Sequence, residues 1–263
     1  MTEEAAYYVI DAFADELFSG NPAGVCLLNE WPSDLLMQRV AAENNLAETA
    51  FFAKSGDDYD LRWFTPKSEI DLCGHATLAS AFVITRYVDP AAQSVRFHTK
   101  SGLLTVCREG DLLEMDFPSR PPKPIPVTDL MTKAIGVPVL EAHLSRDLVL
   151  LVETEREVRD LVPDINALAG LPDGLAVAVT AKGETADFVS RFFAPELGVP
   201  EDPVTGSSHS TLIPFWSERL NRQTMVARQL SARGGTLYCR HLGDRVRIAG
   251  KAIPYLRGTI RLE

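Results

Sequence analysis

The chain has 263 residues, 46% of them apolar and 24% charged, which is ordinary for a soluble globular protein. Its formal net charge of −10 disfavours a nucleic-acid-binding role, since a protein that holds the phosphate backbone needs a basic face. No apolar run approaches the roughly 18 residues of a membrane span, and the acidic start MTEEAAYYVI is not a signal peptide. We therefore expect a cytoplasmic protein that binds neither membranes nor nucleic acid.

The first half of the chain contains short strand signals followed by one apolar helix. The predicted strands are YYVIDAF, AGVCLL, ETAFFA and LRWFT. After Cys73 and Gly74, the segment HATLASAFVITRY is apolar on nearly every face, which predicts a helix that is buried all round. The hairpin SGLLTVCREGDLLEMDF then turns at Gly110-Asp111.

The second half has the same order of elements. GLAVAVT and DFVSRFF are predicted strands, and a helix is predicted in PVTGSSHSTLIPFWSERL, with Pro203 at its first position. The hairpin GGTLYCRHLGDRVRIAG turns at Gly243-Asp244. Neither half shows an alternating strand–helix–strand pattern or a glycine-rich nucleotide-binding motif, so nucleotide-binding folds are disfavoured.

An internal repeat links the two halves. FTPKSEIDLCGHAT and FAPELGVPEDPVTG match with one offset, because Phe64 and Phe193 are 193 − 64 = 129 residues apart, and so are Cys73 and Asp202. We predict an α+β fold of two pseudo-symmetric domains, each a mostly antiparallel sheet wrapped around a central buried helix. The predicted boundaries are residues 1–117 for the first domain, 118–127 for a proline-rich linker and 128–252 for the second.

Polar residues gather at the starts of the two predicted central helices. A helix start carries unpaired N–H groups and partial positive charge, and Gly74 and Gly206 would let backbone amides approach a ligand closely. Two such ends could hold an anion such as a substrate carboxylate. Each residue also has a structural alternative: Asp202 as a helix cap, His75 as a core histidine, Cys73 as a small buried side chain, and Ser207 and Ser208 as donors to nearby backbone.

Glu48, in NNLAETAFF, is the candidate general base. A glutamate at a strand start is most often a surface residue, but here Leu46 and Phe51 belong to apolar surroundings. A carboxylate that is partly desolvated there could exchange protons with a substrate. The four cysteines are scattered and include no CxxC pair, so we expect no disulfide framework and no metal site.

Five segments together resemble the phenazine-biosynthesis isomerase family (PhzF-like): DAFADELFSGNPAGV, NNLAETAFF, FTPKSEIDLCGHAT, EDPVTGSSHS and QLSARGG. The resemblance covers nearly the whole chain. It implies a diaminopimelate-epimerase-like fold with the active site in the cleft between the domains. It also implies a homodimer and a C-terminal strand, about residues 253–263, that crosses back to the first domain.

The resemblance further implies a reaction and a set of roles. The family's founding enzyme isomerises trans-2,3-dihydro-3-hydroxyanthranilate without a cofactor, by moving a proton from one ring carbon to another. Glu48 matches its glutamate base, and His75 and Asp202 match the polar partners that assist proton movement. Ser207, with the amides of Gly74 and Gly206, matches the positions that bind the substrate carboxylate, beside Cys73.

Two other functions remain open at this stage. Related epimerases use two facing cysteines as bases, but Asp202 stands where the second would be, which disfavours that chemistry; a racemase that pairs Cys73 with another base is the first alternative. A non-catalytic binder of a small anion is the second. Ser208 and Ser210 add hydroxyl groups near the expected pocket, so the substrate cannot be carried over from the family.

Overall fold

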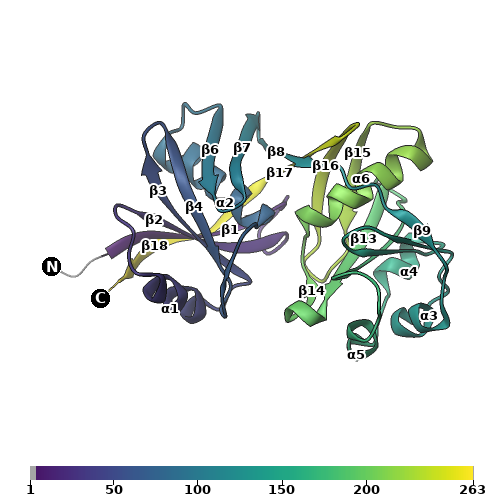
Figure 1. Cartoon of the computed structure of the whole chain (residues 1–263). Coiled ribbons are helices and arrows are strands. Elements are labelled where there is room, and N and C mark those ends of the chain that lie inside the picture. The colour runs from purple at the N-terminus through teal and green to yellow at the C-terminus, as the bar shows by residue number, and fades with distance from the viewer. Residues whose placement is uncertain (1–3, 263) are drawn as a thin grey trace. The chain divides into compact units, whose positions relative to one another are not determined.

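The computed structural model describes residues 4–262, and the chain divides into two compact units (Figure 1). The first unit runs to Asp116 and takes up the chain again from Ala249, and the second is Phe117–Ile248. Within residues 4–262, no helix is both long enough and apolar enough to cross a membrane.

The first unit is a curved mixed sheet with one helix inside it. Its elements are β1 (Glu4–Ala12), β2 (Asn21–Leu28), α1 (Asp34–Asn44), β3 (Glu48–Ser55), β4 (Asp58–Phe64), β5 (Glu69–Ile70), α2 (Gly74–Val83), the π-helix η1 (Ile84–Val88), β6 (Ser94–Thr99), β7 (Gly102–Glu109), β8 (Leu112–Pro118) and β18 (Ala252–Arg261). The C-terminal strand β18 pairs antiparallel with β1, so the two ends of the colour scale lie side by side in Figure 1.

Helix α2 is the core of this unit. It contacts β1, β2, β3 and β18, and all its apolar residues except Phe82 are buried; Leu78, Ala79, Ala81 and Val83 have no exposed surface. Helix α1 lies against the other face of the sheet, where its Met37 packs with Phe51 of β3. The sheet is therefore covered on one face by α2 and on the other by α1.

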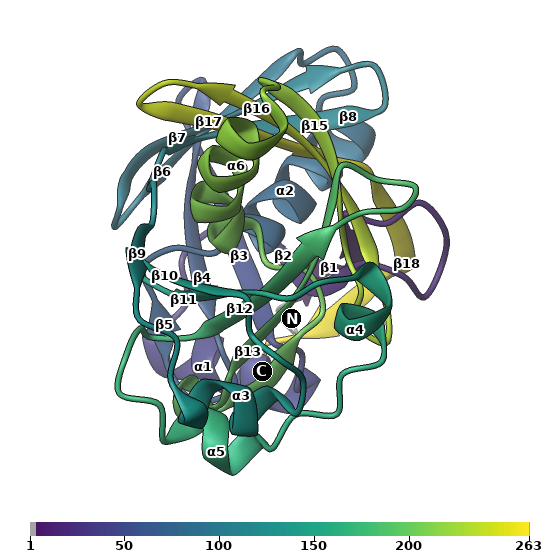
Figure 2. The same ribbon diagram turned by 90° about the vertical axis from the view of Figure 1, so that its right-hand side faces the viewer.

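The second unit has its own elements in a similar order. They are β9 (Lys123–Ile125), α3 (Asp129–Ile135), β10 (Glu141–Leu144), β11 (Leu148–Leu151), α4 (Glu155–Arg159), α5 (Ile165–Ala169), β12 (Val177–Lys182), β13 (Phe188–Ala194), the 3₁₀ turn η2 (Pro195–Leu197), β14 (Val199–Asp202), α6 (Gly206–Leu220), β15 (Thr224–Gln229), β16 (Gly235–Leu242) and β17 (Arg245–Gly250). Its central helix α6 contacts β16 (Figure 2).

The strand pairings of the two units are the same. In the first, β1–β2, β3–β4 and β6–β7 are antiparallel, while β2–β3 and β4–β6 are parallel. In the second, β10–β11, β12–β13 and β15–β16 are antiparallel, while β11–β12 and β13–β15 are parallel. Two units with one pattern of pairing, each built around one buried helix, confirm the predicted α+β fold class.

The proline-rich segment is more than a connector. Residues 123–125 form β9, which pairs with β10. Pro214 lies inside α6 and has no N–H to donate to the carbonyl of Ser210, four residues earlier. That carbonyl instead accepts the backbone N–H of Arg120 at 2.9 Å. The segment therefore satisfies a backbone group that the helix itself leaves open.

Two details of the sequence-based prediction were wrong. Helix α6 begins at Gly206 with Thr205 as its N-cap, so Pro203 is not its first residue, because β14 continues up to Asp202. Beyond the one buried helix predicted for each half, the sequence analysis did not place α1, α3, α4 or α5, although Ser33 caps α1 by accepting the N–H of Leu36. With α1 and α2, the unit contains two strand–helix–strand crossovers between parallel strands.

Candidate active site

Three chain segments converge at one edge of the first unit. Strands β2 and β3 are parallel neighbours that begin at Asn21 and Glu48, and Ala23 pairs with Glu48. Helix α2, which packs against both strands, begins at Gly74. The starts of two strands and of one helix therefore bring Asn21, Glu48 and His75 together.

The direction of the Glu48 side chain follows from the alternation of β3. Phe51 and Ala53 belong to the core cluster that includes Met37 of α1. Because successive side chains of a strand point to opposite faces, Glu48, Ala50 and Phe52 face the side occupied by α2. Glu48 is thus aimed at the first turn of α2.

The imidazole of His75 is the centre of the cluster. Its Nε2 lies 3.1 Å from Oε2 of Glu48, and its Nδ1 lies 3.3 Å from the amide nitrogen of Asn21 and 3.5 Å from the sulfur of Cys73. The side chains of His75 and Glu48 are only 8% and 15% exposed. Among residues 4–262, Oε2 of Glu48 is buried and has no hydrogen-bond partner, so its contact with His75 is an ion pair without aligned hydrogen-bond geometry.

Burial and charge set the protonation of this cluster. Burial raises the pKa of the Cys73 thiol, which therefore stays protonated at neutral pH. Burial lowers the pKa of His75, but its contacts with Cys73 and Glu48 outweigh that effect and raise it well above 6.5. Of these two contacts the one with Cys73 is the larger cause, and the Glu48 carboxylate adds to it. The pair is then an imidazolium beside a carboxylate.

Glu48, Cys73 and His75 also have the spacing of a metal site, because one ligand atom from each lies within 4.8 Å of the others. A zinc ion would need a deprotonated thiol and a neutral imidazole. Burial opposes the deprotonated thiol, and the contacts with Cys73 and Glu48 oppose the neutral imidazole. The donor set therefore fits proton transfer better than metal binding.

The second unit carries a separate cluster at the start of α6. Asp202 ends β14, and its Oδ2 accepts the hydroxyl of Thr205 at 2.5 Å. The amide of Gln229 joins the two residues, since its Nε2 donates to the Asp202 carbonyl at 2.6 Å and its Oε1 accepts the Thr205 N–H at 2.9 Å. Asp202 is not the helix cap; Thr205 holds that position without a side-chain capping bond.

Ser207 is held from another direction. Nη2 of Arg146, just before β11, donates to the Ser207 hydroxyl at 3.1 Å, and the same guanidinium binds the buried Asp147 at 2.8 Å. A guanidinium can only donate, so the Ser207 oxygen accepts this bond and its own proton is available for another acceptor. Ser208 is different, because its hydroxyl is buried and donates to the Thr205 carbonyl.

The structure brings most of the predicted residues together within their own units. Glu48, Cys73, Gly74 and His75 form one cluster, and Asp202, Gly206 and Ser207 lie at the start of α6. Asn21 and Arg146 were missed. Asn21 stands in the quoted motif GNPAGV, just before a predicted strand, and that position was the available sequence signal. Arg146 offered no sequence signal beyond its charge.

The strand register shows how the units differ. Phe64 pairs with Thr49 and Phe193 pairs with Val177, so the residue before Val177, Ala176, is the counterpart of Glu48. Of these two equivalent positions, only that of the first unit has a carboxylate.

The profile of the PhzC-PhzF family, described as phenazine biosynthesis-like protein, matches residues 10–258. The chain belongs to this family. It is 48% identical over 259 residues to an uncharacterized isomerase of Pseudomonas aeruginosa, covering 98% of this chain and 100% of that protein. Two further relatives are also named isomerases, and the chain is therefore an isomerase of the PhzF type.

Solved structures agree with the fold. The crystal structure of a PhzF-family protein from Enterococcus faecalis superposes with a TM-score of 0.97 at 46% identity, covering 98% of this chain and 99% of that one. A hydroxyproline epimerase from Agrobacterium vitis superposes with a TM-score of 0.63 at 11% identity, covering 100% and 94%. The second likeness concerns the fold alone, and it joins this PhzF chain to the wider epimerase-like architecture.

Proposed function

We propose that the protein is a cofactor-independent isomerase that moves a proton between two carbon atoms of a small substrate bearing a carboxylate. The reaction would be similar to the isomerisation of trans-2,3-dihydro-3-hydroxyanthranilate. The observation that carries the proposal is the position of Glu48, whose buried Oε2 lies 3.1 Å from His75 and has no hydrogen-bond partner among residues 4–262.

Glu48 is the proposed base. Its carboxylate takes a proton from one carbon of the substrate, and the electron pair left behind spreads into the adjoining unsaturated system. The protonated Glu48 then returns a proton to a different carbon, so that no proton is gained or lost overall. A positioned carboxylate of this kind contributes a factor of about 10² to 10⁴ to the rate.

His75 is the proposed electrostatic partner. Its raised pKa keeps the imidazolium beside Glu48 at neutral pH, where it can stabilise the negative charge that develops on the substrate. The uncapped first turn of α2 contributes N–H groups of the same polarity. Asn21 lies at the far side of the ring, where Nδ1–H of an imidazolium needs an acceptor, so its amide would present the oxygen to Nδ1.

The second unit supplies the proposed carboxylate-binding residues. The hydroxyl proton of Ser207 is available because Arg146 already occupies its oxygen as a donor. The first N–H groups of α6, beginning at Gly206, are uncapped by any side chain. Asp202, tied to Thr205 and Gln229, is assigned to orienting the substrate.

A thiol mechanism has less support. Burial raises the pKa of Cys73, which lowers the fraction of the reactive thiolate. Its repeat counterpart is Asp202, so the chain does not have the pair of facing thiols on which a two-cysteine epimerase depends.

The deciding experiment follows deuterium entry into carbon positions by proton NMR in heavy water. The substrates are trans-2,3-dihydro-3-hydroxyanthranilate and a panel of small hydroxy and amino acids. Wild type is compared with Glu48→Gln and with Glu43→Gln, which removes an exposed carboxylate of α1. We expect exchange with wild type and Glu43→Gln and a loss of at least about 100-fold with Glu48→Gln.

Exchange that survives in a folded Glu48→Gln protein would remove Glu48 as the base. Exchange that instead disappears in Cys73→Ser would restore the thiol mechanism. Binding of a panel compound without any exchange at carbon would favour a simple anion-binding role.

A further inference from the structure

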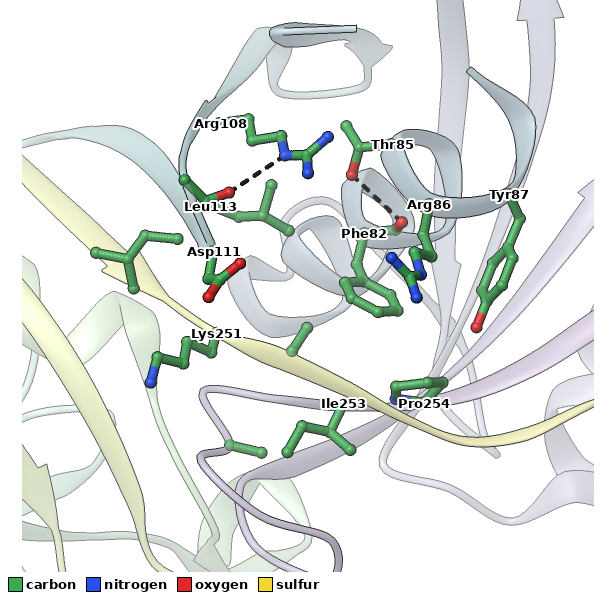
Figure 3. Close-up of a pocket in the computed structure, with 14 residues that line it drawn as sticks. Phe82, Thr85, Arg86, Tyr87, Arg108, Asp111, Leu113, Lys251, Ile253 and Pro254 are labelled. Carbon is green, nitrogen blue, oxygen red and sulfur yellow. Dashed lines mark hydrogen bonds between the residues drawn. The ribbon is translucent and has the colours of Figure 1, made fainter. Parts of the chain in front are cut away.

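The first unit has a pocket at the C-terminal end of α2, away from the Glu48–His75 cluster (Figure 3). Its volume is about 330 Å³, which lies within the range of small-molecule sites. The π-helix η1 forms one wall with Thr85, Arg86 and Tyr87, the turn of the β7–β8 hairpin forms a second, and the start of β18 forms a third.

The wall made by η1 is an unusual piece of backbone. The N–H of Asp89 bonds to the carbonyl of Ile84, five residues earlier, at 2.7 Å. Such π-helical turns are rare and occur frequently at functional sites. Here the turn presents Arg86 and Tyr87 to the pocket, next to the ring of Phe82 from α2.

Two arginines of the pocket have no carboxylate partner. The Arg86 side chain makes no hydrogen bond or ion pair within residues 4–262, and the Arg108 guanidinium bonds only to the carbonyls of Gly110 and Pro90 there, at 3.2 and 3.3 Å. These two bonds hold the Arg108 guanidinium in a fixed direction through Nε and Nη1, and its Nη2 can donate to a ligand.

The pocket is positive in an acidic protein. Its lining has three cations, Arg86, Arg108 and Lys251, and one anion, Asp111. Lys251 is paired with Asp15 at 3.3 Å, so the local balance is 3 − 2 = +1, against −10 for the chain. Charge therefore favours an anion at this point of the surface.

The rest of the lining is apolar. Phe82, Leu113, Ile253 and Pro254 line the same pocket as the two guanidinium groups (Figure 3). A bare inorganic ion would leave these side chains without a partner. A ligand with an acidic group on a flat apolar body would contact both parts of the lining.

We propose that this pocket binds an organic anion, a carboxylate or phosphate carried on an aromatic ring, with Arg86 and Arg108 on the acidic group. The proposal does not depend on the reaction assigned to Glu48. The pocket adjoins Phe82 in the last turn of α2, whereas His75 lies in its first turn, so about 10 Å of helix separates the two sites.

The test is an NMR titration of protein labelled with ¹⁵N at arginine, in which the Nε–H signals of Arg86 and Arg108 are followed. Benzoate and phenyl phosphate are the ring-bearing probes, and acetate and inorganic phosphate are their counterparts without a ring. Variants Arg86→Gln and Arg108→Gln are compared with Arg39→Gln, which removes an exposed arginine of α1 without a partner in residues 4–262. The two ring-bearing probes separate a carboxylate from a phosphate ligand.

We expect at least one ring-bearing anion to shift both signals, with each pocket variant weakening its binding about tenfold and Arg39→Gln leaving it unchanged. Binding should persist in Glu48→Gln, which separates this pocket from the catalytic cluster. The proposal is overturned if neither ring-bearing probe moves the signals with a Kd below about 1 mM. It is equally overturned if the small ions bind as tightly as the ring-bearing ones, or if Glu48→Gln abolishes the shifts.

Discussion

The carboxylate of Glu48 meets the imidazole of His75 with 3.1 Å between Oε2 and Nε2. One residue begins a strand and the other lies in the first turn of the helix that this strand faces. Together with the contact to Cys73, the contact between them raises the pKa of His75 against the opposing effect of burial. The Glu48–His75 contact places the proposed base, Glu48, beside the imidazolium that would stabilise the negative charge developing on the substrate.

The first prediction concerns the titration of His75. Replacing Glu48 by Gln removes one of the two contacts that raise the pKa of His75 and leaves Cys73 and the burial, so this pKa should fall from its raised value. The measurement is the pH dependence of the imidazole Cε1–H signal in wild type and Glu48→Gln. An unchanged midpoint would mean that Glu48 does not set the charge of His75.

The same ion pair predicts how stability depends on pH. A histidine whose pKa is higher in the folded chain stabilises it below the unfolded value, near 6.5, and loses that contribution as pH rises through the folded value. Wild type should therefore lose more unfolding free energy than His75→Gln on going from pH 6.5 into the alkaline range. Urea denaturation of both proteins across that range checks the sign, and a larger loss in His75→Gln would contradict it.

The thiols should differ in reactivity. Burial raises the pKa of Cys73 and brings that of Cys26 to about 12, so both should react with iodoacetamide slowly, whereas Cys107 is only half-buried. We expect Cys107 to be labelled at least about tenfold faster than Cys73 and Cys26 in the folded protein at pH 8. Mass spectrometry of the digested protein measures each site, and urea-unfolded protein is the control in which the sites should become alike.

Cys73→Ser should keep most of the isomerase activity, because the proposed proton transfer uses Glu48 rather than the thiol. Turnover of the substrate found in the heavy-water panel measures this directly. A loss as large as that of Glu48→Gln, in a protein that is still folded, would count against the assignment.

Gly24 marks a place where the backbone has no room for a side chain. A Cβ there would lie 2.4 Å from the hydroxyl of Tyr7 and 2.9 Å from that of Thr49, and both side chains are buried. Gly24→Ala should therefore lower the free energy of unfolding by about 1–3 kcal/mol. Gly258→Ala is the matched control, since no atom lies within 4 Å of its Cβ position; equal stability of the two variants in urea would refute the prediction.

Arg146 and Ser207 should act as one unit in substrate binding. Ser207→Ala removes the donor proposed for the carboxylate, and Arg146→Gln removes the group that orients it, so each should raise KM about tenfold with a smaller effect on kcat. The double variant should be little worse than either single one. Arg156→Gln, at an exposed ion pair of α4, is the control, and strictly additive effects would show that the contact has no functional role.

Much of the fold was predictable because its signals are local. The runs YYVIDAF, ETAFFA and DFVSRFF are strands, and both hairpins turn at their Gly-Asp pairs, where Gly110 and Gly243 adopt positive φ. The nearly all-apolar segment that forms α2 predicted the burial of that helix. Helix α1 was missed because its apolar stripe is weak, although Ser33 and the left-handed Asn45 mark both of its ends.

The candidate site divides in the same way. The sequence by itself determined the duplication, the family and the residue types at the start of each central helix, since these are written in short motifs at a constant offset. The tertiary structure alone decided that Asn21 borders His75 and that Arg146 holds Ser207. Alternation along a strand tells which face a residue takes, but which residue it meets there depends on the pairing of strands that are distant in the chain, and no local pattern contains that information.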